Sequence, residues 1–145
     1  MIPRMDAEQI IDANRYMTLA TAGAGGAPWA SPVWFAHADY REFYWVSRPD
    51  ARHSLNLAER PELAIVIFDS TVVQLHGEAV YMTATAEMTE HGIEVFNERG
   101  IAQGLREWTV ADVTPPARHR LYKATAIEQW ILGEGDVRVD VRRTA

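Results

Sequence analysis

The stretch YMTLATAGAGGAPWASPVWF, residues 16–35, decides the fold that the sequence predicts. Tyr16–Thr21 is rich in residues that favour strands, and the glycines of Gly23–Gly26 predict a turn. A second strand is predicted over Trp29–Ala36, so the stretch indicates an antiparallel hairpin. Pro32 lies inside this second strand and cannot donate a ladder hydrogen bond, which indicates an edge strand or a bulge.

Short strands and helices follow the hairpin. Asp50 stands where it could cap a helix that Pro61 ends. The run Leu63–Phe68 is continuously apolar, which predicts a strand buried on both faces. The other predicted strands are Glu42–Ser47, Val72–Thr83 and Arg120–Leu132, with a short one at Val137–Val141, and the predicted helices are Asp6–Arg15, Ala51–Arg60 and Ala86–Arg99.

The order of these elements predicts the fold class. Short turns rather than helical crossovers join consecutive strands, which predicts mostly antiparallel pairing. Gly77 inside the strand Val72–Thr83 indicates a bulge or a barrel bend. We predict a mainly β protein with flanking helices, built as one domain over residues 1–145 around an antiparallel barrel of about six or seven strands.

The composition excludes several kinds of site and partner. The chain has no cysteine, which excludes disulfides, thiolate metal sites and cysteine nucleophiles. Its five histidines share no short ligand spacing, so no metal site is predicted. The formal net charge of −6 argues against nucleic acid as a partner. The sequence has no leader pattern and no apolar run of ~18 residues, so we expect a cytoplasmic protein with no membrane partner.

Three stretches carry a resemblance to a known family. They are Met17–Phe35, then Phe43–Ser47 with Ala51–Leu57 and Pro61–Asp69, and last Arg120–Trp130. In this order they resemble the pyridoxamine 5′-phosphate oxidase-like family of FMN-binding split β-barrels, over residues 6–132. The resemblance implies a homodimer that holds FMN between its subunits. It also implies flavin or deazaflavin chemistry on a small-molecule substrate, or simple flavin storage.

The resemblance assigns four residues to the flavin phosphate: Ser47, Arg52, His53 and, on the same helical face, Asn56. A phosphate dianion favours a helix N-terminus, a hydroxyl group and cations, and this segment offers all three. Arg52 in the first helical turn opposes the helix dipole, which favours an anionic ligand there. The alternative is a solvated helix start that binds nothing.

Five further residues have two interpretations each. Pro32, Val33 and Trp34 could supply an apolar wall and free backbone groups to the flavin ring, or Val33 could be core and Trp34 a surface or interface residue. By resemblance, Gln74 reaches the flavin from the second subunit and Trp130 closes over it. The alternatives are a solvent-facing strand residue at Gln74 and dimer-interface packing at Trp130.

We predict an FMN-dependent oxidoreductase that moves hydride or electrons between flavin and a reduced nicotinamide or small organic substrate. Ser31 and Ala36 stand where true pyridoxamine 5′-phosphate oxidases carry basic residues, and Arg138–Asp140 lacks their histidine, which argues against vitamin B6 oxidation. No catalytic acid or base is identified. The alternatives are a deazaflavin-dependent reductase, a non-enzymatic flavin-binding module and a cofactor-free dimeric barrel. A dimer would also cover the tryptophans expected to be exposed, Trp29, Trp34, Trp45 and Trp130.

Overall fold

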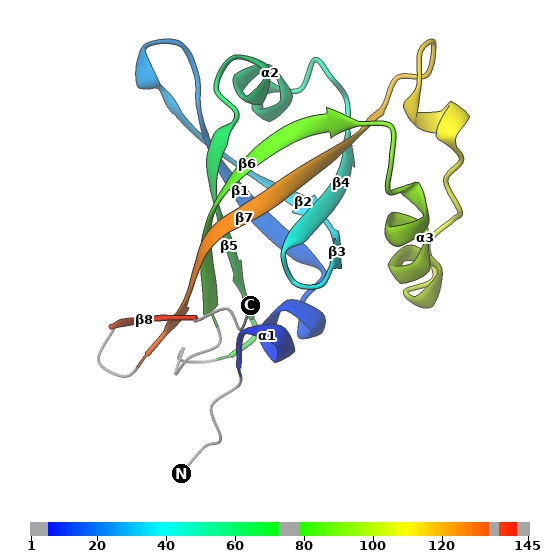
Figure 1. Cartoon of the computed structure of the whole chain (residues 1–145). Coiled ribbons are helices and arrows are strands. Elements are labelled where there is room, and N and C mark those ends of the chain that lie inside the picture. The colour runs from blue at the N-terminus through cyan, green and yellow to red at the C-terminus, as the bar shows by residue number, and fades with distance from the viewer. Residues whose placement is uncertain (1–5, 73–78, 134–136, 142–145) are drawn as a thin grey trace.

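The structure, a computed structural model, describes residues 6–72, 79–133 and 137–141. Its strands and helices are arranged as a curled sheet with helices around it (Figure 1). The strands are β1 (Tyr16–Ala22), β2 (Pro28–Trp34), β3 (Ala36–Ala38), β4 (Glu42–Ser47), β5 (Glu62–Phe68), β6 (Ala79–Thr89), β7 (Arg120–Leu132) and β8 (Arg138–Asp140). The helices are α1 (Ala7–Ala13), α2 (Arg52–Glu59) and α3 (Ile93–Ala102), with 3-10 turns at Ala24–Gly26 and Val110–Val113.

All eight described strands belong to one antiparallel sheet, which confirms the predicted fold class. Seven strands follow the order β2-β1-β5-β6-β7-β4-β3, and β8 pairs with β7. The sheet curls until β2 and β4, which lie near opposite ends of this order, approach each other (Figure 1). The result is a barrel that is split between β2 and β4.

The interior of the barrel is filled by side chains from one face of each strand. Phe35 and Trp45 are fully buried, and Trp45 stacks on Tyr122 with ring centroids 5.7 Å apart. The prediction that Trp45 is exposed is therefore wrong. Helix α1 closes one end of the barrel with the buried Ile10 and Ile11, and α2 lies at the opposite end (Figure 1).

The position of Pro32 confirms the predicted edge strand. Pro32 lies in β2, the last strand of the sheet, opposite Thr18 of β1. The β1–β2 register runs without interruption from Tyr16 opposite Trp34 to Ala22 opposite Pro28. The alternative prediction, a bulge at Pro32, is therefore wrong, because an edge strand accommodates proline on its unpaired side.

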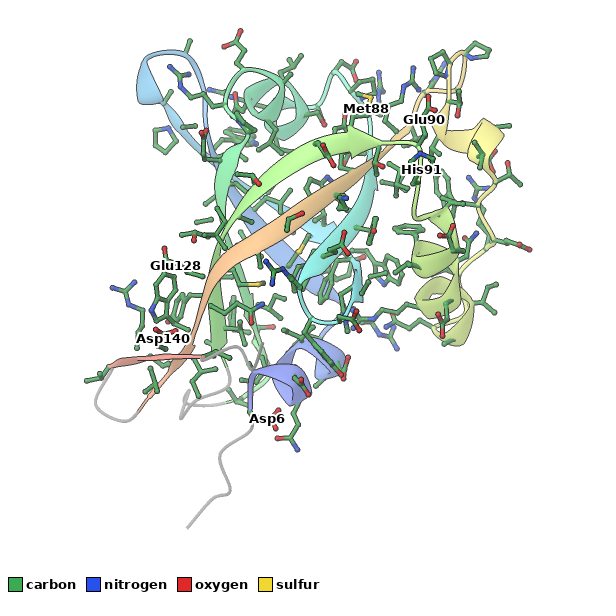
Figure 2. The ribbon with its side chains drawn as sticks, viewed as in Figure 1. Asp6, Met88, Glu90, His91, Glu128 and Asp140 are labelled. Carbon is green, nitrogen blue, oxygen red and sulfur yellow. The ribbon has the colours of Figure 1, made fainter. Side chains whose placement is uncertain are left out.

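The predicted helix over Ala86–Arg99 is wrong in its first part. Strand β6 continues to Thr89 and pairs with β7 along its end. Figure 2 shows Met88, Glu90 and His91 following one another along this end of β6 and the turn after it. The burial alternates from Val80 to Glu87, across the predicted start of the helix, which is the pattern of a strand with one face on the core.

Helix α3 begins only after Gly92, which takes a backbone φ of 108° at its N-cap position. A Cβ atom at Gly92 would collide with the ring of Tyr44. The strand, the glycine turn and the short helix together contain the apolar residues that suggested one continuous helix. Here local turn chemistry decided the structure rather than helical spacing.

Helix α2 starts close to where the sequence predicts, but Asp50 does not cap it. Asp50 instead accepts two hydrogen bonds from Arg48, one of them at 2.8 Å. The N-cap residue is Ala51, which offers no side-chain hydrogen bond. The first turn of α2 is therefore left without a side-chain cap, which matters for the site described below.

Strand β5 is buried on one face only. Leu63, Ile65 and Ile67 point into the barrel, whereas Ala64 and Phe68 are exposed. The prediction of a strand buried on both faces is therefore wrong for the single chain. Gly77, at which the sequence predicts a bulge, lies outside the described residues. In the described part of the chain, no helix has the length and hydropathy needed to cross a membrane.

Candidate functional site

The barrel is split where two strand edges face each other without pairing. Strand β2 ends the sheet, since β1 is its partner in the described sheet. Strand β4 pairs with β7 along its whole length, but β3 covers its other edge only from Glu42 to Tyr44. Among the described strands, the outer edge of β4 from Trp45 to Ser47 is therefore open toward β2.

The open edge of β2 presents backbone groups to this split. The Phe35 N–H donates to the Arg15 carbonyl at 3.3 Å, which makes these two residues a hydrogen-bonded pair of the β1–β2 ladder. Because such pairs alternate along an antiparallel ladder, Val33 also faces β1. The backbone groups of Pro32 and Trp34 consequently point to the open edge. A flat ligand with polar ring edges could hydrogen bond there.

A cleft of about 460 Å³ opens at this split, and we call it the β2–β4 cleft. Its volume lies within the range of about 300–1,000 Å³ typical of small-molecule and cofactor sites. Five of the nine predicted cofactor residues line it: Pro32, Val33 and Trp34 from β2, Ser47 from β4 and His53 from α2. The other lining residues are Tyr16, Val46, Phe96, Leu105, Arg106, Trp108 and His119.

The polar end of the cleft lies where β4 leads into α2. The Ser47 hydroxyl and His53 Nε2 are hydrogen bonded at 2.9 Å. Because Ala51 offers no side-chain cap, the first backbone N–H groups of α2 have no side-chain acceptor there. Arg52 lies in the same turn but outside the cleft lining, with its guanidinium 4.5 Å over the Trp29 ring. The arrangement of hydroxyl, imidazole, helix N-terminus and nearby guanidinium suits an anion.

Besides Arg52, two of the described site residues, Asn56 and Trp130, lie outside the lining of the cleft of this chain. Asn56 is buried on the inner side of α2, where its side-chain amide donates to Thr21 Oγ1 at 3.0 Å. Trp130 lies in β7 opposite Tyr81 of β6, away from the cleft lining. Gln74 lies outside the described residues. Their assignments to the cofactor stay predictions.

The outer wall of the cleft was missed by the sequence reasoning. It comes from α3 and the segment that leads to β7. Trp34 packs edge-on against Phe96 with centroids 4.9 Å apart, and its Nε1–H donates to Gln103 Oε1 at 2.8 Å. Trp108 packs against His119 with centroids 5.5 Å apart. The only signal in the sequence for this wall was the presence of Trp108 and His119 in the segment that the sequence predicts to be mostly irregular.

The segment that carries Trp108 is fixed in place although it has little secondary structure. The Trp108 N–H donates to Asn97 Oδ1 at 2.8 Å, and Asn97 Nδ2 donates to the Trp108 carbonyl at 2.6 Å. The Arg106 guanidinium stacks 3.8 Å from the Trp108 ring centroid. Asn97 of α3 therefore positions an aromatic wall and a cation at the mouth of the cleft.

The burial of His53 predicts a pH dependence of folding. Loss of solvent around the imidazole lowers the pKa of His53 below its ordinary value of about 6.5. The unfolded chain then binds more protons at slightly acidic pH, so stability is complete above about pH 6.5 and falls as the pH drops below it. We expect His53→Gln to lose less free energy of unfolding than the wild type between pH 7.5 and pH 5.5. Urea titrations at both pH values measure this, and equal losses in the two proteins would contradict it.

Comparison with known proteins gives matches at two levels. A sequence model described as pyridoxamine 5′-phosphate oxidase matches residues 5–130. Among proteins of curated function, none matches the chain. Solved structures match over most of the chain at identities of 21% or less for those described below, a level that shows the fold alone.

HutZ, the heme storage protein of Vibrio cholerae, is 21% identical, with a TM-score of 0.66 over 86% of this chain and 92% of its own. A heme binding protein of Mycobacterium smegmatis is 20% identical, with a TM-score of 0.69 over 97% of this chain. This chain covers 59% of the length of that protein. A Clostridium acetobutylicum protein of the pyridoxinephosphate oxidase family, related to general stress protein 26, is 11% identical, with a TM-score of 0.64 over 94% of this chain and 91% of its own.

The sequence match and the fold agree. The matched residues 5–130 include all three helices and every described strand except the end of β7 and the short β8. The antiparallel split barrel is the fold that the resemblance predicted. The chain therefore belongs to the pyridoxamine 5′-phosphate oxidase family.

Proposed function

We propose that the β2–β4 cleft binds FMN and that the chain is a flavin-dependent oxidoreductase. The observation that supports the proposal is that one cleft combines open strand edges with a site suited to a phosphate. The unpaired edges of β2 and β4 offer backbone groups to a flat polar ring. The hydrogen-bonded Ser47 and His53 lie at the uncapped N-terminus of α2, where a phosphate dianion would be favoured.

The residues present fit an isoalloxazine ring and a phosphate. Val33 and Trp34 supply an apolar wall, and the Pro32 carbonyl and Trp34 backbone face the open edge. The Ser47 hydroxyl can donate to a phosphate oxygen, and so can a ring N–H of His53. Arg52 lies close enough in the chain to add positive charge without entering the cleft.

A bound flavin would supply hydride or electron transfer, and the protein would position it and limit access. In the described chain, His53, Arg106 and His119 are the titratable side chains of the cleft other than Tyr16. Trp108 and Trp34 line the cleft on the α3 side, where they would limit the access of water to a bound flavin. Arg106 at the mouth favours a substrate that carries negative charge.

We also propose that the protein is a homodimer with the flavin at the subunit interface. The exposed outer face of β5 carries Ala64 and Phe68, and β7 exposes Ile127. The half-buried Trp130 lies on β7 near this face, and β2 exposes Trp29. A second copy would remove these apolar side chains from water. Light scattering at low and high protein concentration would reveal the stoichiometry.

Titration of FMN with the purified chain tests the proposal. We expect saturable quenching of flavin fluorescence, because Trp34 and Trp108 line the cleft. The expected dissociation constant is on the order of 1 µM. A deazaflavin with a long anionic tail is the matched ligand, since it keeps the ring shape and changes the anionic end. Binding of the deazaflavin alone would support a deazaflavin-dependent reductase. Absence of binding by either ligand would overturn the proposal.

Haem is a second candidate ligand for the same cleft. Two imidazoles, His53 and His119, line it, and histidine is a common axial ligand of haem iron. HutZ and the Mycobacterium smegmatis protein, which share the fold, are described as haem proteins. Titration with haemin should then give a sharp Soret band that His119→Ala weakens. A broad Soret band unchanged by His119→Ala would exclude this candidate.

A further inference from the structure

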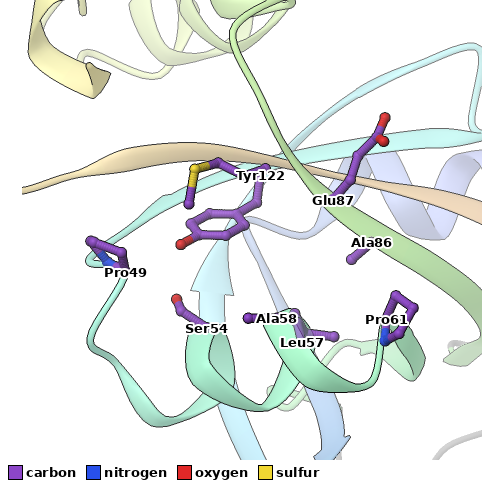
Figure 3. A pocket seen from close by; sticks show the side chains of 9 residues that line it. Pro49, Ser54, Leu57, Ala58, Pro61, Ala86, Glu87 and Tyr122 are labelled. Carbon is purple, nitrogen blue, oxygen red and sulfur yellow. The ribbon is translucent and has the colours of Figure 1, made fainter. Parts of the chain in front are cut away.

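A second pocket lies on the other side of α2, between this helix and the end of β6 (Figure 3). Its volume is about 440 Å³, and it shares no lining residue with the β2–β4 cleft. We call it the α2–β6 pocket. Its lining residues are Pro49, Ser54, Leu57, Ala58, Pro61, Ala86, Glu87, Met88 and Tyr122.

The pocket has an apolar wall and an aromatic wall. Leu57, Ala58 and Pro61 line it from the side of α2, and Ala86 lines it from β6 (Figure 3). The buried ring of Tyr122, held by its stacking on Trp45, forms the aromatic wall. A site of this volume and polarity favours a small, mostly apolar ligand.

One polar group lies inside the pocket without a partner. Ser54 is 3% exposed, and its hydroxyl oxygen has no hydrogen-bond partner among the described residues. Figure 3 shows the Ser54 side chain pointing from α2 toward Tyr122, into the pocket. A buried hydroxyl without a partner costs stability, and a ligand that hydrogen bonds to it removes that cost.

The charges around the pocket disfavour an anionic ligand. The described residues that line it include no lysine, arginine or histidine. The one charged lining residue is Glu87, whose carboxylate lies 3.4 Å from Lys123 Nζ and points away from Ser54 (Figure 3). A buried carboxylate on a ligand would have no cation to compensate its desolvation.

We propose that the α2–β6 pocket is a binding site for a small, uncharged, mostly apolar molecule that carries one hydroxyl group. The apolar rings or chains of the ligand fill the space between Leu57, Ala86 and Tyr122. Its hydroxyl group exchanges a hydrogen bond with Ser54 Oγ, which can both donate and accept. The proposal is independent of the flavin, because it concerns other residues.

Titration of the full chain with 2-naphthol, naphthalene and 2-naphthoate tests this site. The three probes share one bicyclic ring and differ in carrying a hydroxyl group, no polar group or a carboxylate. We expect 2-naphthol to bind with a dissociation constant on the order of 0.1 mM, measured by the fluorescence of the probe. Naphthalene should bind about 5- to 10-fold more weakly, as expected for one lost hydrogen bond, and 2-naphthoate at least as weakly as naphthalene.

Two variants locate the bound probe. Ser54→Ala should weaken 2-naphthol about 5- to 10-fold and leave naphthalene unchanged, since only 2-naphthol can use the hydroxyl of Ser54. Ala58→Trp, at an exposed position on the pocket wall, should fill the pocket and abolish binding of both probes. Circular dichroism and thermal unfolding establish that each variant is folded.

Three results would overturn the proposal. The first is no saturable binding of 2-naphthol, as expected if the pocket is filled in solution by a partner copy or another part of the chain. The second is binding unaffected by both variants, which would place the probe elsewhere, for example in the β2–β4 cleft. The third is tighter binding of 2-naphthoate than of 2-naphthol, which would mean that the pocket selects anions.

Discussion

Replacing Arg99 with methionine is expected to lower the free energy of unfolding by about 3 kcal/mol. The guanidinium of Arg99, on α3, donates to three backbone carbonyls at 3.2 Å or less: those of Phe35, Ile11 and Asn14. It also stacks 4.4 Å from the ring centroid of Phe35. Methionine keeps the apolar stem but leaves these carbonyls without the donor, and a half-buried carbonyl without a partner is costly.

The location of these carbonyls explains why the effect should be large. Ile11 and Asn14 lie at the end of α1, whereas Phe35 follows β2. Arg99 therefore joins α3, α1 and the strand edge that borders the β2–β4 cleft. Burial lowers the pKa of Arg99 from its ordinary value, yet an arginine side chain stays charged between pH 6 and pH 8. The loss should accordingly be the same at pH 6 and pH 8.

Urea titration of Arg99→Met and of Arg106→Met measures the effect against a matched control. Arg106 also stacks on an aromatic ring, that of Trp108, but its side chain is 59% exposed and its carboxylate partner lies 3.4 Å away. A surface pair of this kind contributes about 0–1 kcal/mol. Losses of equal size in the two variants would mean that the carbonyl contacts of Arg99 contribute little.

The strands could be predicted from the sequence where alternation and turns agree. Arg120–Leu132 is found with the predicted limits, because its apolar residues alternate and Pro115-Pro116 precede it. The limit of this reasoning appears at residues 86–99, where one helix was expected and the end of a strand, a turn and part of a shorter helix are found. The positive φ at Gly92 separates the two elements, and a glycine inside an apolar pattern does not reveal that by itself.

The cleft was predictable only in the part that is local in sequence. Ser47 and His53 are six residues apart, so a strand followed directly by a helix brings them together. Trp108 and His119 reach the same cleft from the segment between α3 and β7. Two hydrogen bonds with Asn97 hold Trp108, and His119 packs against Trp108. Such long-range contacts depend on how α3 packs on the barrel, and periodicity in one sequence carries no information about that.

The orientation of Asn56 illustrates the same limit within one helix. The spacing of three residues places Asn56 near His53 on one side of the predicted helix, and both residues lie in α2 of the structure. However, Asn56 lies on the side of the helix that faces the barrel, where its side chain donates to Thr21. Its amide oxygen lies so close to Gly23 that a Cβ atom there would be 2.9 Å away. Which side of α2 faces the core follows from the packing of β1, not from the helix alone.

Replacing His53 with glutamate is expected to weaken FMN binding by at least about 100-fold while leaving the fold intact. The substitution places a carboxylate beside Ser47, where we propose that the phosphate dianion binds. Two like charges in one partly buried site repel each other strongly. The fold should tolerate the change, because α2 has no acidic residue in its first turn and an anion there interacts favourably with the helix dipole.

Riboflavin provides the matched ligand for this prediction, since it has the same ring and lacks the phosphate. His53→Glu should leave riboflavin affinity within about 3-fold of the wild type, whereas His53→Gln, which adds no charge, should weaken FMN only a few-fold. Fluorescence titration of both ligands against the three proteins gives the comparison. Equal losses for FMN and riboflavin would mean that His53 contacts the ring rather than the phosphate. If His53→Glu retained FMN binding, the phosphate could not bind at the N-terminus of α2.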